Sequence, residues 1–217
     1  MKKENTNLLS IIEILETLYP HPECALYYTT PIQFLVAVIL SAQCTDKRVN
    51  EVTKTLFKKY KTVEDFTKAV PAEFETEIFS TGFYRAKTKN ILGAVQAIQN
   101  NFSGKVPKTM SELITVPGVG RKTANVVLGE LYGTAEGIAV DTHVIRLSRL
   151  FRLTKERDAI KIEKDLMKIV PKNDWVNFSH VLILYGREYC KAHCKHTDCP
   201  LAQFAKEGEK SSIERDK

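Results

Sequence analysis

The sequence predicts an almost entirely helical protein, and three observations support this prediction. Apolar residues recur at helical spacing along most of the chain. Helix start signals precede several of these segments, and we find no run that alternates apolar and polar residues as a half-buried strand would. With 217 residues and 43% hydrophobic content, the chain is long enough to bury a sizeable core.

The first expected helix runs from about Leu8 to Leu18 and ends before Pro20. Thr30 followed by Pro31 marks the next start, because threonine caps helices and proline suits the first helical position. By periodicity alone, the apolar run from Phe34 to Leu40 fits either a buried strand or a buried helix. The start signal and the lack of partner strands favour a central, fully buried helix.

Further helices are expected at Val49 to Leu56, at Ile91 to Phe102 and at Ile162 to Ile169, the last ending at Pro171. Thr109 and Glu112 have the spacing of a capping box. Breaks at residues 104–107 and 133–137 separate the helical blocks. The closing residues, KEGEKSSIERDK, have the composition of a solvated tail, so we expect disorder from about residue 206.

Composition excludes some classes of protein. The 32 basic and 26 acidic residues give a formal charge of +6, which suits a polyanionic partner. Five cysteines and a start, MKKENTN, without the apolar segment of a signal peptide argue against a secreted disulfide framework. We therefore expect a cytoplasmic protein. The longest apolar run, Phe34 to Leu40, is too short to span a membrane.

The segment LITVPGVGRKTANVVL, residues 113–128, places a proline and two glycines between two apolar runs. It is not a P-loop, because Thr115 stands where that pattern needs its first glycine and Arg121 separates Gly120 from Lys122. Two interpretations stay open. The glycines make a tight turn between packed helices, or they let a DNA phosphate approach the backbone at the start of the second helix.

Together with LSAQCTDKRVN (residues 40–50) and VDTHVIRL (residues 140–147), this segment resembles the endonuclease III family in order and spacing. The resemblance runs from about Leu8 to Phe204. It implies an all-α, two-lobed helix-hairpin-helix DNA glycosylase fold. Residues 23–133 would form the central domain, and residues 1–22 with 134–217 would form a second domain across a cleft.

The function implied by the resemblance is base excision repair of DNA. Such an enzyme is a bifunctional N-glycosylase that removes oxidised pyrimidines, and an AP lyase that cleaves 3′ to the abasic site by β-elimination. Lys122 matches the lysine that forms the Schiff base, and its amine has the chemistry to attack C1′. Asp141 matches the catalytic aspartate, and it also suits a helix N-cap. The partner is double-stranded DNA with a damaged base or an abasic site, and we expect a monomer.

DNA-binding residues follow from the same resemblance. Gln43 and Phe83 are expected to fill the space left when the damaged nucleotide leaves the stack, although leucine is commoner in the family at Phe83. Arg85 and Lys87 are expected to contact phosphates, or to form a solvated helix face. The hairpin residues expected to grip the backbone are Pro117, Gly118, Val119, Gly120, Arg121 and Thr123.

The C-terminal cysteines depart from the family, whose four-cysteine loop, C-x6-C-x2-C-x5-C, holds a [4Fe-4S] cluster. Cys190 and Cys199 match two of these ligands, Cys194 is offset, and Ala205 stands at the fourth position. Three outcomes stay open: an incomplete cluster site, a zinc site of Cys190, Cys194 and Cys199 with His193 or His196, or no metal. Catalysis by an amine requires no cofactor in any of these cases.

Two alternative functions are compatible with the same residues. One is a monofunctional glycosylase of the same fold, although such relatives lack the lysine at position 122. The other is a non-catalytic helix-hairpin-helix module that binds DNA, which leaves the pairing of Lys122 with Asp141 unexplained. Strand cleavage discriminates between these alternatives and the bifunctional enzyme.

Overall fold

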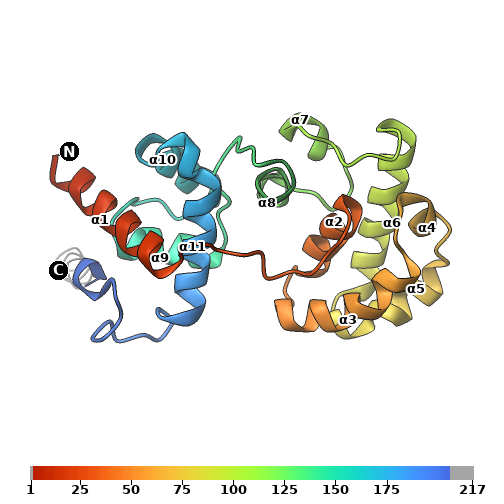
Figure 1. Ribbon diagram of the computed structural model, residues 1–217, viewed down its shortest axis with the longest axis horizontal. Coiled ribbons are helices and arrows are strands. Elements are labelled where there is room, and N and C mark those ends of the chain that lie inside the picture. The colour runs from red at the N-terminus through yellow and green to blue at the C-terminus, as the bar shows by residue number, and fades with distance from the viewer. Residues whose placement is uncertain (1, 206–217) are drawn as a thin grey trace. The chain divides into compact units, whose positions relative to one another are not determined.

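The computed structural model describes residues 2–205, with side chains from residue 7 onward, and within this range its regular elements are all helical (Figure 1). This confirms the predicted all-α class. The tail expected from residue 206 lies outside the described residues. The chain divides into two compact units, Glu23–Thr134, here the central unit, and Met1–Pro22 with Ala135–Lys217, here the terminal unit. No helix of the described part is both long and apolar enough to cross a membrane.

The central unit is built around helix α2, which has eight buried residues among its ten. The Thr30 hydroxyl caps this helix by accepting a hydrogen bond from the Gln33 N–H, as its start signal predicts. Helix α6 packs against α2, α4 and α5, and α8 packs against α2 and α7. The elements of this unit are α2 (Pro31–Leu40), α3 (Asp46–Lys59), α4 (Val63–Thr67), α5 (Pro71–Ile78), the 3-10 helix η1 (Phe79–Thr81), α6 (Tyr84–Asn101), α7 (Met110–Leu113) and α8 (Arg121–Tyr132).

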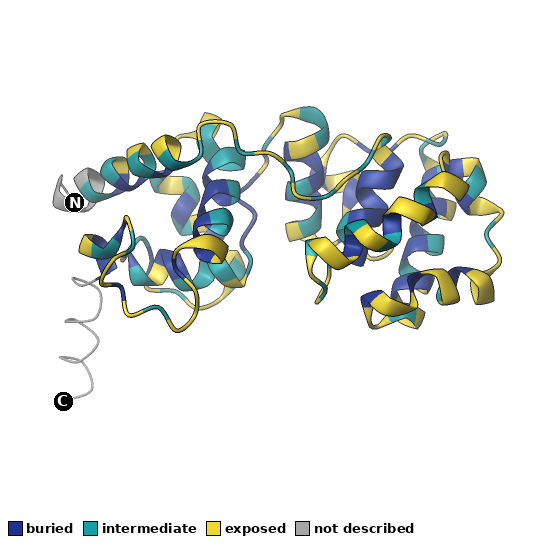
Figure 2. Cartoon of the chain, turned by 60° about the horizontal axis from the view of Figure 1, so that its bottom comes forward, coloured by how far each residue is buried: buried dark blue, intermediate teal, exposed yellow. Residues whose placement is uncertain are grey.

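The terminal unit joins the two ends of the chain in one hydrophobic core. Its elements are α1 (Lys2–Leu18), α9 (Thr142–Leu150), α10 (Ala159–Ile169), the 3-10 helix η2 (Lys172–Asp174) and α11 (Trp175–Glu188). Helix α11 packs against α1 and α9, and α10 packs against α9. The buried stripe of α1, including Ile11 and Leu15, faces this core and follows the predicted helical spacing (Figure 2).

The short helix α7 begins at a cap that differs in detail from the predicted capping box. The Thr109 hydroxyl accepts a hydrogen bond from the Glu112 N–H at 3.4 Å and donates one to the Glu112 carboxylate at 2.8 Å. The threonine and the glutamate therefore contact each other through their side chains. This cap fixes the first turn of the hairpin that leads into α8.

Candidate functional site

The connection between α7 and α8 is a tight hairpin anchored by apolar side chains. The Val116 N–H donates to the Leu113 carbonyl at 3.0 Å, and the Val119 N–H donates to the Val116 carbonyl at 3.1 Å. Leu113, Val116 and Val119 are buried in the core of the central unit. The residues exposed at the tip are Pro117, Gly118 and Gly120. Buried apolar side chains thus anchor the turn to the core of the central unit, while the residues at its tip stay exposed to solvent.

Helix α8 begins at Gly120, which has extended backbone angles and no side chain with which to cap the helix. The first N–H groups of a helix have no partner within it, and they carry the positive end of the helix dipole. An added Cβ at Gly120 would meet nothing within 4 Å, so the space beside the N-cap residue is open. Arg121 and Lys122 in the first turn are exposed, and Thr123 is half-buried. This geometry suits an anion, such as a backbone phosphate.

Asp141 lies at the N-terminus of α9 in the terminal unit. Its Oδ1 accepts a hydrogen bond of 2.9 Å from the Val144 N–H, and its side chain is half-buried. The N-cap role that the sequence suggests is therefore present. The cap holds the carboxylate in a fixed orientation at the start of the helix.

The terminal unit has a basic pocket whose lining begins at Thr142, the residue after Asp141. The sequence did not predict this pocket. It has a volume of about 460 Å³ and lies between α9 and the end of α11. The lining residues are Thr142, His143, Arg146, Gly186, Arg187, Lys191 and Ala192. In the sequence, the helical spacing of His143 and Arg146 indicates that these two side chains lie on one face of a helix. It does not indicate that residues 186–192 lie beside them in a pocket.

His143 fits into this pocket because its neighbour on α11 is a glycine. A Cβ added to Gly186 would lie 2.7 Å from His143 Nδ1, so an alanine there would displace the ring. Burial lowers the pKa of His143, the nearby Asp141 carboxylate raises it, and the Arg146 and Arg187 guanidinium groups lower it. The neutral imidazole is therefore favoured in the folded protein.

The two predicted gap-filling residues share an unusual backbone conformation. Gln43 has a φ of 52° and Phe83 has a φ of 49°, a left-handed region that residues other than glycine rarely occupy. Both side chains are exposed, and 65% of the Phe83 surface is accessible to solvent. Gln43 lies in the connection between α2 and α3, and Phe83 directly precedes α6. An exposed phenylalanine held in a strained turn is typical of a residue with a binding role.

The two predicted phosphate contacts, Arg85 and Lys87, differ in exposure. The Arg85 side chain is 79% exposed, with Nε 3.9 Å from a Glu75 carboxylate oxygen. Lys87 is only 4% exposed, and its ammonium donates to the carbonyl oxygens of Leu40 and Thr81. Because this ammonium group is buried in the central unit, Lys87 is not available for the predicted phosphate contact.

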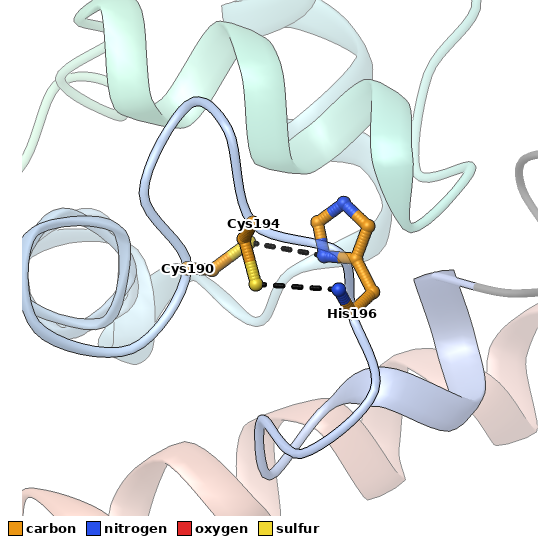
Figure 3. A group of neighbouring side chains, drawn as sticks. All are labelled: Cys190, Cys194 and His196. Atoms are coloured by element: carbon orange, nitrogen blue, oxygen red, sulfur yellow. Dashed lines mark hydrogen bonds between the residues drawn. The ribbon is translucent and has the colours of Figure 1, made fainter.

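Three side chains near the end of the chain form a group of metal-ligating atoms (Figure 3). The ligand atoms of Cys190, Cys194 and His196 all lie within 4.8 Å of one another. Cys190 Sγ is 3.5 Å from His196 Nδ1, and the His196 N–H donates to Cys194 Sγ at 3.3 Å. Arg146 donates to both the sulfur and the carbonyl oxygen of Cys190. The loop is therefore tied to α9 at its first cysteine.

The structure groups two of the three predicted cysteine ligands with a histidine. Cys199 lies outside this group. Ala205, at the position of the fourth family cysteine, is fully buried in the core of the terminal unit. A [4Fe-4S] cluster takes four thiolates, so the residues present here do not fit that cofactor.

Comparisons with known proteins identify the class to which this fold and hairpin belong. Residues 36–172 match the model of the HhH-GPD superfamily, described as base excision DNA repair proteins. The chain is 49% identical over 210 residues to the endonuclease III of Synechocystis sp. (strain PCC 6803), covering 94% of this chain and 96% of that protein.

Two solved structures of endonuclease III on DNA are also similar. A non-covalent complex has a TM-score of 0.89 and 39% identity, and a trapped covalent intermediate has a TM-score of 0.89 and 40% identity. Each comparison covers 96% of this chain and 98% of the other. The chain therefore belongs to the endonuclease III family. It is a bifunctional DNA glycosylase and AP lyase of base excision repair.

Proposed function

We propose that this enzyme removes oxidised pyrimidines from duplex DNA and then cleaves the strand 3′ to the abasic site, with Lys122 as the nucleophile. The observation that carries this proposal is the exposed Lys122 in the first turn of α8, directly after an anchored turn with an open backbone. The covalent intermediate with DNA that was trapped for a 40% identical endonuclease III supports covalent chemistry for this enzyme as well. No step requires a metal or a redox cofactor.

The reaction follows from the chemistry of a primary amine at C1′. The neutral Lys122 amine forms a bond to C1′ while the bond from C1′ to the base breaks, and the base leaves with a proton. The nitrogen lone pair then forms a double bond to C1′ while the bond from C1′ to the ring oxygen O4′ breaks, and that oxygen takes up a proton. The resulting iminium ion acidifies the hydrogen at C2′. Removal of that proton expels the 3′ phosphate, and water then hydrolyses the imine to regenerate the lysine.

Asp141 is the proposed second catalytic residue. A carboxylate stabilises positive charge that develops on the sugar as the base departs, or it accepts a proton during the elimination. The hydrogen bond from the Val144 N–H to Oδ1 supports this role because it fixes the carboxylate before DNA binds. Capping and catalysis are compatible, since a carboxylate has two oxygens.

DNA is proposed to contact residues of both units. The hairpin residues with Arg121 and Thr123 bind one backbone phosphate, and Arg85 binds another. Gln43 and Phe83 enter the duplex where the damaged nucleotide has left it. The basic pocket, whose lining includes the cations of Arg146 and Lys191, is proposed to accept a further phosphate, because its volume and charge suit an oxyanion.

The cysteine group is proposed to bind one zinc ion through Cys190, Cys194 and His196. With typical Zn–S and Zn–N bonds, a tetrahedral site places a sulfur and a nitrogen about 3.6 Å apart. The 3.5 Å between Cys190 Sγ and His196 Nδ1 agrees with that spacing. The fourth ligand is water or Cys199. The zinc would stiffen the loop that carries Lys191 and takes no part in bond breaking.

Borohydride trapping on a duplex with one abasic site tests the catalytic proposal. Wild type is expected to give a covalent protein–DNA adduct, and Lys122→Ala is expected to give none. Lys105→Ala is the matched control, because it removes an exposed lysine of the same unit, and it should trap normally. An adduct that persists in Lys122→Ala would show that a different amine attacks C1′.

A further inference from the structure

Lys87 connects two separate turns of the central unit. Nζ donates hydrogen bonds of 2.8 Å to the Leu40 carbonyl and 2.8 Å to the Thr81 carbonyl. Leu40 is the last residue of α2, and Thr81 is the last residue of η1. A single buried ammonium group therefore joins the points at which the chain leaves both helices.

Each of these carbonyls closely precedes one of the exposed residues with positive φ. Gln43 follows Leu40 in the same connection, and Phe83 follows Thr81. The Lys87 backbone N–H also donates to the Phe83 carbonyl at 3.0 Å. A strained backbone persists only where its surroundings determine it, and Lys87 supplies part of those surroundings for both turns.

The buried charge is stabilised by the same contacts. An unpaired ammonium in a protein core is costly, whereas carbonyl oxygens satisfy its donors. The Leu40 carbonyl belongs to the C-terminus of α2, where the helix dipole is negative and favours a cation. A methionine of similar length would fill this space without any burial of charge. Unlike methionine, the ammonium group also donates hydrogen bonds to two carbonyl groups.

We propose that Lys87 is a positioning residue that holds Gln43 and Phe83 at a fixed separation, so that both side chains enter the duplex together. This inference rests on the proposed function, which assigns the gap-filling role to these two residues. A pre-organised pair does not lose the freedom of two independent turns when DNA binds. The benefit is confined to substrates in which a nucleotide must leave a base-paired stack.

Lys87→Met and Lys89→Met provide a matched pair, because both remove one positive charge from α6 and only Lys89 is exposed. Lys87→Met is expected to slow base release from a duplex with an oxidised pyrimidine by at least about tenfold. Lys89→Met should slow it less than about twofold. Both variants should cleave an abasic site in single-stranded DNA at nearly the wild-type rate, because no gap has to be filled there.

A double-mutant cycle tests whether Lys87 acts through the two turns. In a Gln43→Ala, Phe83→Ala background, Lys87→Met should cause less than about a twofold further loss. Lys87→Gln keeps an amide donor and should fall between wild type and Lys87→Met. Equal losses on duplex and single-stranded substrates, or an undiminished effect in the cycle, would overturn the inference. Failure of the proposed function would look different, since wild type would then give no trapped adduct on any substrate.

Discussion

Gly118 lies so close to Asn90 that a Cβ at position 118 would be 2.7 Å from the Asn90 Cβ. The φ of Gly118 is 76°, which disfavours any residue with a side chain. The tip of the hairpin therefore meets α6 at a position that only glycine fits. This contact sets how closely the α7–α8 turn packs against α6.

Gly118→Ala is predicted to lower the free energy of unfolding by about 2–4 kcal/mol, because it adds both steric overlap and a left-handed alanine. Gly120→Ala is the control, since its added Cβ meets nothing within 4 Å and its φ is −89°. That change should cost about 1 kcal/mol or less. Urea unfolding measures both variants, and similar losses would contradict the packing described for Gly118.

Asp141→Asn separates capping from catalysis at one residue. Asparagine caps a helix as well as aspartate does, so stability should change by less than about 1 kcal/mol. Loss of the carboxylate should slow base release by about 10²–10⁴-fold. Asp158→Asn, at the N-cap of α10, is the matched control and should keep full activity. Single-turnover kinetics with equal rates for the two variants would remove Asp141 from the catalytic set.

Purified protein is predicted to contain about one zinc per chain by elemental analysis. Cys194→Ala and His196→Asn should lose the metal, and asparagine suits position 196 because the φ there is 53°. Cys24→Ala should retain the zinc, and Cys199→Ala tests whether that thiol is the fourth ligand. Iron with visible absorbance would indicate a cluster instead, and metal-free protein would show that packing alone holds the loop.

Phosphate binding in the basic pocket predicts a change in salt dependence. Lys191→Ala should reduce the slope of log affinity against log salt concentration by about 0.9, the value for one phosphate contact. Lys164→Ala removes an exposed lysine of α10 outside the pocket and should leave the slope unchanged. Fluorescence anisotropy on a duplex at several salt concentrations measures the slopes. Identical slopes would mean that Lys191 contacts no phosphate.

The lowered pKa of His143 predicts that stability falls at acidic pH. Its pKa lies below the usual 6.5 chiefly because the ring is buried, so the unfolded chain takes up a proton first as the pH falls. The stability that depends on the neutral ring is present above about pH 6.5 and decreases toward the folded pKa. Thermal unfolding at pH 7.5 and 5.5 should show a larger loss for wild type than for His143→Gln. Equal losses would mean that another group controls the pH response.

The sequence alone determined the elements that depend on local chemistry. Helical spacing with the Thr30 cap identified Phe34 to Leu40 as a buried helix, and the VPGVG turn placed Lys122 at the start of another. These features depend on neighbouring residues, whose spacing a helix or turn fixes. The order of the quoted motifs then identified the family to which the chain belongs.

Tertiary structure decided which side chains lie inside and which distant residues meet. Lys87 belongs to the same basic stretch as Arg85, yet it is buried because α2 and η1 place two carbonyls at its ammonium. Likewise, Arg146 meets Cys190, and His196 rather than Cys199 joins the cysteine pair. A lysine or a cysteine has the same local pattern whether it is exposed or enclosed. Only contacts between segments far apart in the chain determine its environment.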